Sequence, residues 1–195
     1  ANEKKLQTSE FDLSAINVFA WPVSWRNITT YFHDWHYYNL FWSQHDAIDI
    51  AVNQWTNVVA SGPGYAYFIV PPKSGWYSYM AIKHPGWFVT VYGHLSEILV
   101  SEWQFVQWGD LIAKSWWLPW TPWAGPMTTW PHLHFEVWKD RKPVDPLRFL
   151  SLAGMDFELL PWIYEDKFIQ DIIEASGNEK EGNKYQKKFV IKKIE

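Results

Sequence analysis

Two of the seven histidines lie two residues apart within residues 132–136, which read His-Leu-His-Phe-Glu. Because side chains at i and i+2 of a β-strand share one face, His132 and His134 are expected to project together, with Glu136 next along that face. Leu133 and Phe135 would then point into a core. Two histidines on one face of a strand can form part of a metal site or transfer protons. A polar outer face fits the same spacing, so this segment alone leaves both interpretations open.

A second pair, His45 and Asp49, offers two further metal ligands. On a straight strand their Cα atoms would lie about 13 Å apart, too far for zinc bonds of about 2.0–2.2 Å. The pair can therefore share a metal only if this segment enters its strand through a turn. Taken in isolation, a surface turn with a capping aspartate is the simpler interpretation.

The chain contains no cysteine, which excludes disulfides, thiol catalysis, iron–sulfur clusters and Cys-ligated zinc. A metal site must therefore use histidine and carboxylate ligands. His45, Asp49 and His134 together would give three ligands and an open fourth position, which is typical of a catalytic zinc site. His132 would then lie beside the metal as a proton-transfer group, and His94 is the candidate for a second such group.

The elements that position these residues are expected to be β-strands. From Trp21 onward, short β-branched and aromatic segments alternate with turn signals about every ten residues, which predicts an antiparallel β sandwich or barrel-like fold. Residues 115–131 show no strand pattern and are expected to form a long loop leading into His132. The expected strands cover residues 27–32, 47–52, 58–60, 66–70, 77–83, 88–92, 98–100, 110–114 and 132–138.

The chain of 195 residues divides into a leader (1–20), a β domain (21–150) and a C-terminal extension (151–195). Apolar residues between 156 and 176 have helical spacing, interrupted by Pro161, and predict a short helical region. The formal net charge of −4 argues against a strongly basic nucleic-acid binder. No run of 18 apolar residues occurs, which predicts that no helix spans a membrane.

Three motifs, in their order and spacing, resemble the LytM/lysostaphin-type zinc endopeptidases, which cut peptidoglycan peptides. The resemblance covers about residues 21–150, since Trp21-Pro22-Val23, residues 56–60 and Asp145-Pro146 also agree. The three motifs are His45-x-x-x-Asp49, Tyr92-x-His94-Leu95 and His132-x-His134-Phe135-Glu136.

The resemblance implies that His45, Asp49 and His134 bind Zn²⁺ and that His94 and His132 are the catalytic histidines. Zinc would polarise the scissile carbonyl and lower the pKa of its water towards about 7. One histidine would take the proton of the water, and the other would bond the developing oxyanion. Which of His94 and His132 has which role stays open.

Other polar residues are expected to have smaller roles. Glu136 is expected beside the metal site or at its rim, not as a fourth ligand. His84, in a Lys-His-Pro-Gly turn, is expected to be structural, and residues 33–36 to form a solvated turn. Tyr37 or Tyr38 is a candidate for a phenol near the transition state, because a tyrosine near this point has that role in the family.

The leading interpretation is a zinc endopeptidase that hydrolyses peptide bonds in bacterial cell-wall peptidoglycan. The alternative is a non-catalytic domain of the same type that binds and regulates a cell-wall amidase. Such domains lose one or more of the five site residues, and all five are present here, which favours the enzyme. A carbohydrate-binding β sandwich rests on aromatic content alone. A protein acting on peptidoglycan is expected to be exported to the cell envelope or beyond, with an apolar signal or anchor encoded upstream of Ala1.

Tryptophan usage is abnormal, with 16 Trp against 10 Gly. A left-handed backbone costs a non-glycine residue about 1–2 kcal/mol. If the eleven tryptophans named below all occupied such sites, their summed cost would be comparable to the free energy of unfolding of a whole domain, about 5–15 kcal/mol. A gene that uses UGA for glycine, translated as if UGA were tryptophan, would explain the counts; the alternative is a truly Trp-rich groove for glycan. The family pattern has glycine at the positions of Trp25, Trp42, Trp55, Trp76, Trp87, Trp103, Trp116, Trp117, Trp120, Trp123 and Trp130.

Overall fold

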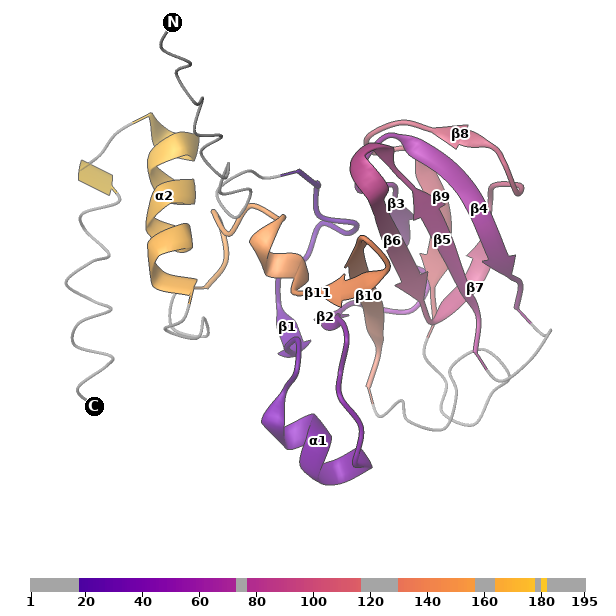
Figure 1. The fold of residues 1–195 in the computed structure, drawn as a ribbon, viewed down its shortest axis with the longest axis horizontal. Coiled ribbons are helices and arrows are strands. Elements are labelled where there is room, and N and C mark those ends of the chain that lie inside the picture. The colour runs from indigo at the N-terminus through magenta and orange to yellow at the C-terminus, as the bar shows by residue number, and fades with distance from the viewer. Residues whose placement is uncertain (1–17, 73–76, 117–129, 157–163, 178–179, 182–195) are drawn as a thin grey trace, which may run out of the picture.

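The computed structural model describes residues 18–72, 77–116, 130–156, 164–177 and 180–181 (Figure 1). Within them the fold is mainly β, with two antiparallel sheets, as expected, and two short α-helices. The larger, eight-stranded sheet has the order β1-β2-β10-β6-β5-β4-β8, with β11 paired to β10, and the smaller has the order β3-β9-β7. The strands are β1 (Ile28–Thr30), β2 (Ile48–Ala51), β3 (Asn57–Val59), β4 (Gly64–Val70), β5 (Tyr79–Lys83), β6 (Phe88–Gly93), β7 (Leu95–Ile98), β8 (Phe105–Val106), β9 (Leu111–Ser115), β10 (His132–Lys139) and β11 (Lys142–Val144).

Strand β10 lies inside the larger sheet, between β2 and β6. Its residues Leu133, Phe135 and Val137 are completely buried in the apolar core. His134 and Glu136 are less buried and lie on the other face of the strand. The alternation predicted from the sequence is therefore confirmed, and it places the polar residues of β10 together on the face opposite the core.

Helix α1 (Trp35–Phe41) was not expected, because its segment was interpreted as part of a solvated turn. Asp34 begins the helix, since its side chain accepts hydrogen bonds from the backbone N–H groups of His36 and Tyr37 at 2.8 and 3.0 Å. No residue of α1 is buried. Figure 1 shows α1 extending from the β1–β2 region, away from the sheets.

Three strand assignments also differ from the sequence prediction. The strand expected at residues 98–100 is β7, which spans Leu95–Ile98, and β8 and β11 were not expected at all. Strand β11 contains Pro143, a residue that is unfavourable in a sheet interior, and among the strands of the described residues it pairs with β10 alone. The expected loop at 115–131 lies mostly outside the described residues.

Helix α2 (Glu165–Ser176) confirms the later part of the expected helical region, and residues 157–163 lie outside the described part of the chain. The helix ends at Gly177, which has the left-handed φ of 64° common at helix ends. The Asp171 carboxylate accepts a hydrogen bond from the backbone of Leu152, which ties α2 to the end of the β region. None of the helices in the described residues is long and apolar enough to cross a membrane.

Candidate metal centre

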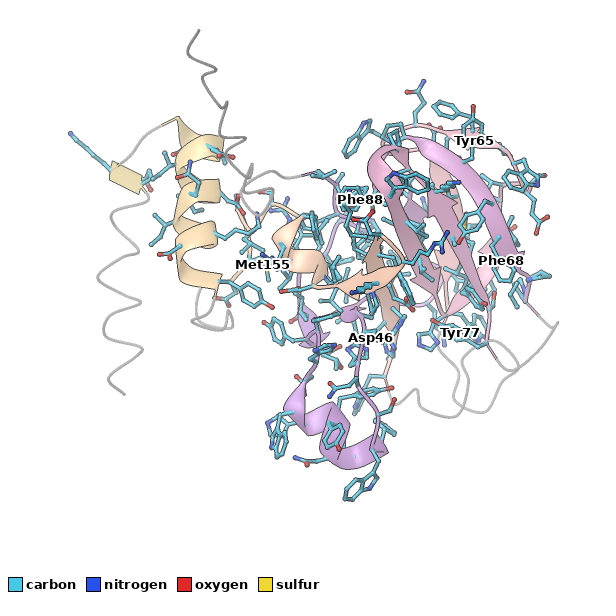
Figure 2. The ribbon with its side chains drawn as sticks, in the orientation of Figure 1. Asp46, Tyr65, Phe68, Tyr77, Phe88 and Met155 are labelled. Carbon is cyan, nitrogen blue, oxygen red and sulfur yellow. The ribbon has the colours of Figure 1, made fainter. Side chains whose placement is uncertain are left out.

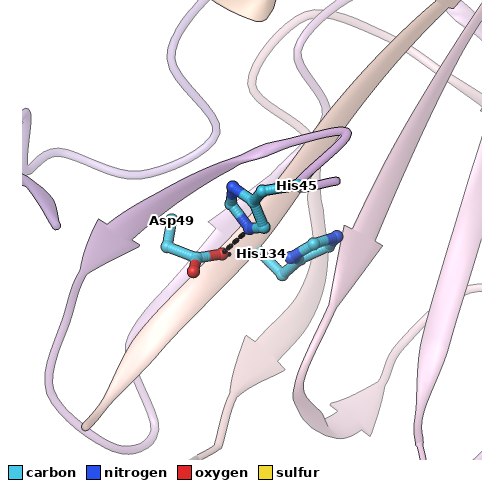
Figure 3. Close-up of side chains that lie close together, drawn as sticks. All are labelled: His45, Asp49 and His134. Atoms are coloured by element: carbon cyan, nitrogen blue, oxygen red, sulfur yellow. Dashed lines mark hydrogen bonds and ion pairs between the residues drawn. The ribbon is translucent and has the colours of Figure 1, made fainter. Parts of the chain in front are cut away.

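The centre forms where β2 and β10 pair. Asp49 on β2 lies directly opposite His134 on β10, and His134 Nδ1 is 3.0 Å from Asp49 Oδ1. His45 precedes β2, which begins only at Ile48, so the chain can bend between them. His45 Nε2 lies 3.2 Å from the same Asp49 oxygen (Figure 3). The turn that a shared metal requires is therefore present.

The chemistry and spacing of these three side chains fit a zinc ion. Their ligand atoms lie within 4.8 Å of one another, and tetrahedral zinc bonds of 2.0–2.2 Å would place them roughly 3.3–3.6 Å apart. His45 Nδ1 donates to the backbone carbonyl of Tyr31 at 3.0 Å, which directs Nε2 towards Asp49. Apart from the 3.2 Å contact with Asp49, the buried His45 Nε2 has no hydrogen-bond partner among the described residues, as expected for a nitrogen that binds a metal.

His94 and His132 lie next to the three candidate ligands. Their rings are 4.6 Å apart and perpendicular, and both residues are buried. His132 Nε2 is 3.6 Å from Asp49 Oδ1, and its Nδ1 bonds the backbone carbonyl of Trp130 at 2.7 Å. His94 has a left-handed φ of 58°, which is uncommon for a non-glycine residue and typical of functional sites. All five residues singled out in the sequence thus lie together.

The groups of the centre shift one another's pKa values. Burial alone would raise the pKa of Asp49, but the neighbouring His132, His134 and His45 hold it well below its usual value. Burial alone would lower the pKa of His134, but its bonds to the carboxylates of Asp49 and Glu136 raise it to about 9. Burial lowers the pKa of His132, which favours the neutral imidazole that can accept a proton.

Two tyrosines complete the surroundings. The Tyr37 ring lies 4.6 Å from the His45 ring, so of the two tyrosines considered before β2 it is Tyr37 that reaches the cluster. Tyr77, which the sequence reasoning missed, lies with its ring 5.0 Å from His94. A Cβ atom at Gly93 would come within 1.8 Å of the Tyr77 hydroxyl oxygen, so the phenol requires glycine there. The alternation of Tyr77 and Tyr79 in an expected strand was the available signal.

A groove of about 1140 Å³ crosses the outer face of the large sheet. Tyr77 and Glu136 line it next to the metal centre, and further along it is lined by aromatic side chains from β4, β5 and β10 and by the cations Lys83 and Arg141. Figure 2 shows Phe68 and Tyr77 on this part of the molecule. The groove therefore connects the metal centre with a mostly aromatic surface.

The remaining histidines, His33, His36 and His84, are not among the candidate ligands. His84 bonds the Pro63 carbonyl through Nδ1 and the Thr90 hydroxyl through Nε2, each at 2.8 Å, which agrees with the expected structural role. His33 forms an exposed ion pair with Asp46 at 3.1 Å. Neither belongs to the group of convergent metal ligands found among the described residues.

An antiparallel β fold with a buried His-Asp-His cluster, two adjacent histidines and a groove is the arrangement of a metallopeptidase domain. The chain belongs to peptidase family M23, whose model matches residues 43–146. The resemblance drawn from the three motifs is thus confirmed.

Three curated relatives represent different members of this group. A lipoprotein NlpD/LppB homolog of Pseudomonas aeruginosa is 31% identical over 136 residues, covering 70% of this chain and 41% of the relative. The peptidoglycan DD-endopeptidase ShyB of Vibrio cholerae is 33% identical over 105 residues, covering 53% and 22%. The murein hydrolase activator NlpD of Escherichia coli is 27% identical over 135 residues, covering 69% and 32%. The chain therefore spans less than half the length of each of these relatives.

Among solved structures, a zinc-containing peptidase from Vibrio cholerae matches with 30% identity and a TM-score of 0.55. The match covers 68% of this chain and 39% of the other. This share of the chain is larger than the share that the family model matches.

Proposed function

We propose that the protein is a zinc-dependent endopeptidase that hydrolyses peptide bonds in cell-wall peptidoglycan. The observation that carries the proposal is the convergence of His45, Asp49 and His134 on one point, with His94 and His132 in contact beside it. The endopeptidase ShyB, named for its action on peptidoglycan, supports the substrate class.

The residues of the centre have different roles in the proposed hydrolysis. His45, Asp49 and His134 would hold zinc, which supplies polarisation of a carbonyl and a lowered pKa for water. His132, held by its bond to the Trp130 carbonyl and kept neutral by burial, is suited to accept a proton at Nε2. His94, perpendicular to His132, is suited to donate a hydrogen bond to the oxyanion. The reverse assignment of His94 and His132 uses the same geometry.

The groove provides a place for the substrate chain. It begins at Tyr77 and Glu136, beside the metal centre, and continues over the aromatic face of the sheet. Burial raises the pKa of Tyr77 well above its usual value, so the phenol remains a hydrogen-bond donor. A peptide lying in the groove would meet both apolar surface and a phenol donor next to the reacting bond.

The second candidate is a domain that activates a cell-wall amidase, as the name of the E. coli relative indicates for that protein. The presence of all five site residues in one cluster favours hydrolysis by the chain itself. For location, we propose the cell envelope or its exterior, where peptidoglycan lies; the lipoprotein name of the P. aeruginosa relative supports this.

The test is digestion of purified peptidoglycan by the zinc-loaded chain, with mass spectrometry of the released fragments and metal analysis of the protein. Fragments cut within their peptides, absent with a His134→Ala variant, are expected. A parallel reaction contains a cell-wall amidase with and without the chain. Stimulation of the amidase by a chain that releases nothing alone would overturn the endopeptidase proposal and support the activator.

A further inference from the structure

We infer that Glu136 and Trp138 position His134 for metal binding, an inference that rests on the proposed zinc site. The three side chains alternate along β10 and so share one face of the strand. His134 Nε2 lies 3.1 Å from Glu136 Oε1, and Trp138 Nε1 donates to the second carboxylate oxygen of Glu136. The contacts run in one line from the metal centre into the groove.

The two ring nitrogens of His134 meet different partners. Nδ1 faces Asp49 within the ligand cluster, whereas Nε2 faces Glu136. A metal ion shared with Asp49 needs the lone pair of Nδ1, so the one N–H of a neutral imidazole must then be on Nε2, where the Glu136 carboxylate accepts it. The lone pair on Nδ1 is then directed at the cluster, so Glu136 selects the tautomer that binds metal.

The charge balance of the metal site also supports a role for Glu136 beside His134. Asp49 is the one carboxylate among the three candidate ligands, so a divalent cation would leave a net charge of +1 in a buried place. Glu136, largely buried beside His134, supplies the second negative charge. A buried carboxylate needs both oxygens bonded, and the Trp138 indole N–H meets that need.

The test measures zinc affinity of the full chain by competition with a chelator. Glu136→Gln keeps the shape of the side chain and removes its charge, so zinc binding should weaken roughly 10–100-fold, the usual effect of losing such a partner. Trp138→Phe keeps an aromatic ring and removes the N–H, and a smaller loss in the same direction is expected. Glu97→Gln, which breaks an exposed ion pair with Lys114, is the matched control and should leave the affinity unchanged.

A purely structural role for Glu136 would lower the melting temperature and leave the zinc affinity of the folded protein as it was. Unchanged affinity in Glu136→Gln, with zinc bound by the unmodified chain, overturns this inference and leaves the metal site standing. Failure of the unmodified chain to bind zinc overturns the proposed function as well.

A second inference rests on the backbone. Trp42, Trp55, Trp87 and Trp103 have φ angles of 55°, 63°, 64° and 66°. Bulky residues are genuine outliers in this left-handed region, whereas glycine adopts it freely. Trp42 also occupies the position that follows α1, where helices commonly end in glycine.

The side chains of these four tryptophans are mostly exposed, so their burial does little to offset the cost of the left-handed backbone. Their exposed fractions are 82, 55, 71 and 67%, in chain order. Trp21 and Trp138 differ, since the Trp21 indole is buried and donates to the Ser151 carbonyl at 2.6 Å, and that of Trp138 donates to Glu136. Tryptophan therefore fits its surroundings at positions 21 and 138 and conflicts with the backbone at the four others.

We propose that the natural protein has glycine at positions 42, 55, 87 and 103, because its gene is read with a code in which UGA specifies glycine. Trp25, Trp116 and Trp130 do not have a left-handed φ, contrary to the expectation from the sequence. For them, and for positions 76, 117, 120 and 123, which lie outside the described residues, glycine rests on the sequence resemblance alone. Each replaced indole in the groove, such as Trp87 or Trp103, would open more space for substrate.

Sequencing the gene and mapping tryptic peptides of the protein from its own organism test this directly. UGA codons and glycine-containing peptides are expected at the four positions, with UGG and tryptophan at positions 21 and 138 of the same gene as internal controls. UGG codons or tryptophan-containing peptides at the four positions overturn the proposal. UGA read as glycine at 21 or 138 would contradict the distinction drawn from the side-chain contacts.

Discussion

His84 and His134 lie at opposite ends of the β5–β6 hairpin, and their surroundings differ in kind. His84 follows the last residue of β5 and bonds a carbonyl and a hydroxyl, both uncharged. His134 lies opposite Gly93 at the other end and has a carboxylate at each ring nitrogen. Burial therefore does not distinguish a structural histidine from a functional one. The convergence of ionisable groups does, because only a bound cation or proton makes such crowding favourable.

The largest effect should come from substituting His134, the histidine assigned to the metal centre. His134→Ala removes a candidate ligand, so zinc and hydrolysis of peptidoglycan should both be lost. Metal analysis of the purified variant together with a peptidoglycan digest provides the measurement. Full zinc occupancy in His134→Ala would remove His134 from the ligand set.

His94→Ala and His132→Ala should keep zinc and lose turnover by roughly 10²–10⁴-fold each, the usual contribution of proton transfer or of one oxyanion donor. Single-turnover rates and zinc content are measured on the same preparations. Loss of zinc from the His132 variant, combined with surviving activity in the His94 variant, would reverse the division between ligands and catalytic histidines.

For the structural histidine, His84→Leu should lower the free energy of unfolding by about 1–3 kcal/mol, because the Pro63 carbonyl and Thr90 hydroxyl lose a buried partner. Zinc content and turnover of the folded protein should stay as they are. Denaturant unfolding and the digest are compared on both proteins; a selective loss of activity would place His84 in the functional group.

The pH dependence of the free energy of unfolding gives a second test of the structural role of His84. Burial lowers the pKa of His84 in the folded protein, so below about pH 6.5 the unfolded chain binds a proton at this residue more readily than the folded one. Stability from neutral His84 is thus present above that pH and is lost as the pH falls. The stability advantage over His84→Leu should shrink between about pH 7.5 and 5; an advantage that grows would contradict the assignment.

The smallest effect is expected at His33, whose ion pair with Asp46 is exposed. His33→Ala should change the free energy of unfolding by at most about 1 kcal/mol and leave hydrolysis unaffected. Thermal unfolding and the peptidoglycan digest detect either change. A large loss of activity would show that this side chain contacts the substrate.

The sequence predicted the centre better than the elements around it. The spacing of His132 and His134 follows directly from strand geometry, and the bend before Asp49 follows from the reach of a metal bond. Helix α1 was missed because its residues have no apolar periodicity and none is buried, although the capping signal of Asp34 was present. Strand β11 was missed because Pro143 argues against a strand, while its pairing with β10 overrides that preference. The alternation of Tyr77 and Tyr79 indicates which face of a strand Tyr77 occupies, but it does not specify the close approach to Gly93 that brings Tyr77 to the centre.

The pairing of Phe19 with Leu150 has a consequence for how the domain can be attached to other structures. These two residues form a parallel bridge, and Phe19 N donates to the Phe149 carbonyl at 3.0 Å, so the chain enters and leaves the β region at one place. The Phe19 ring packs 4.9 Å from that of His84, at the end of the hairpin farthest from His134. A tether joined there would be attached at the end of the domain opposite the metal centre, which would leave the metal centre facing away from the point of attachment.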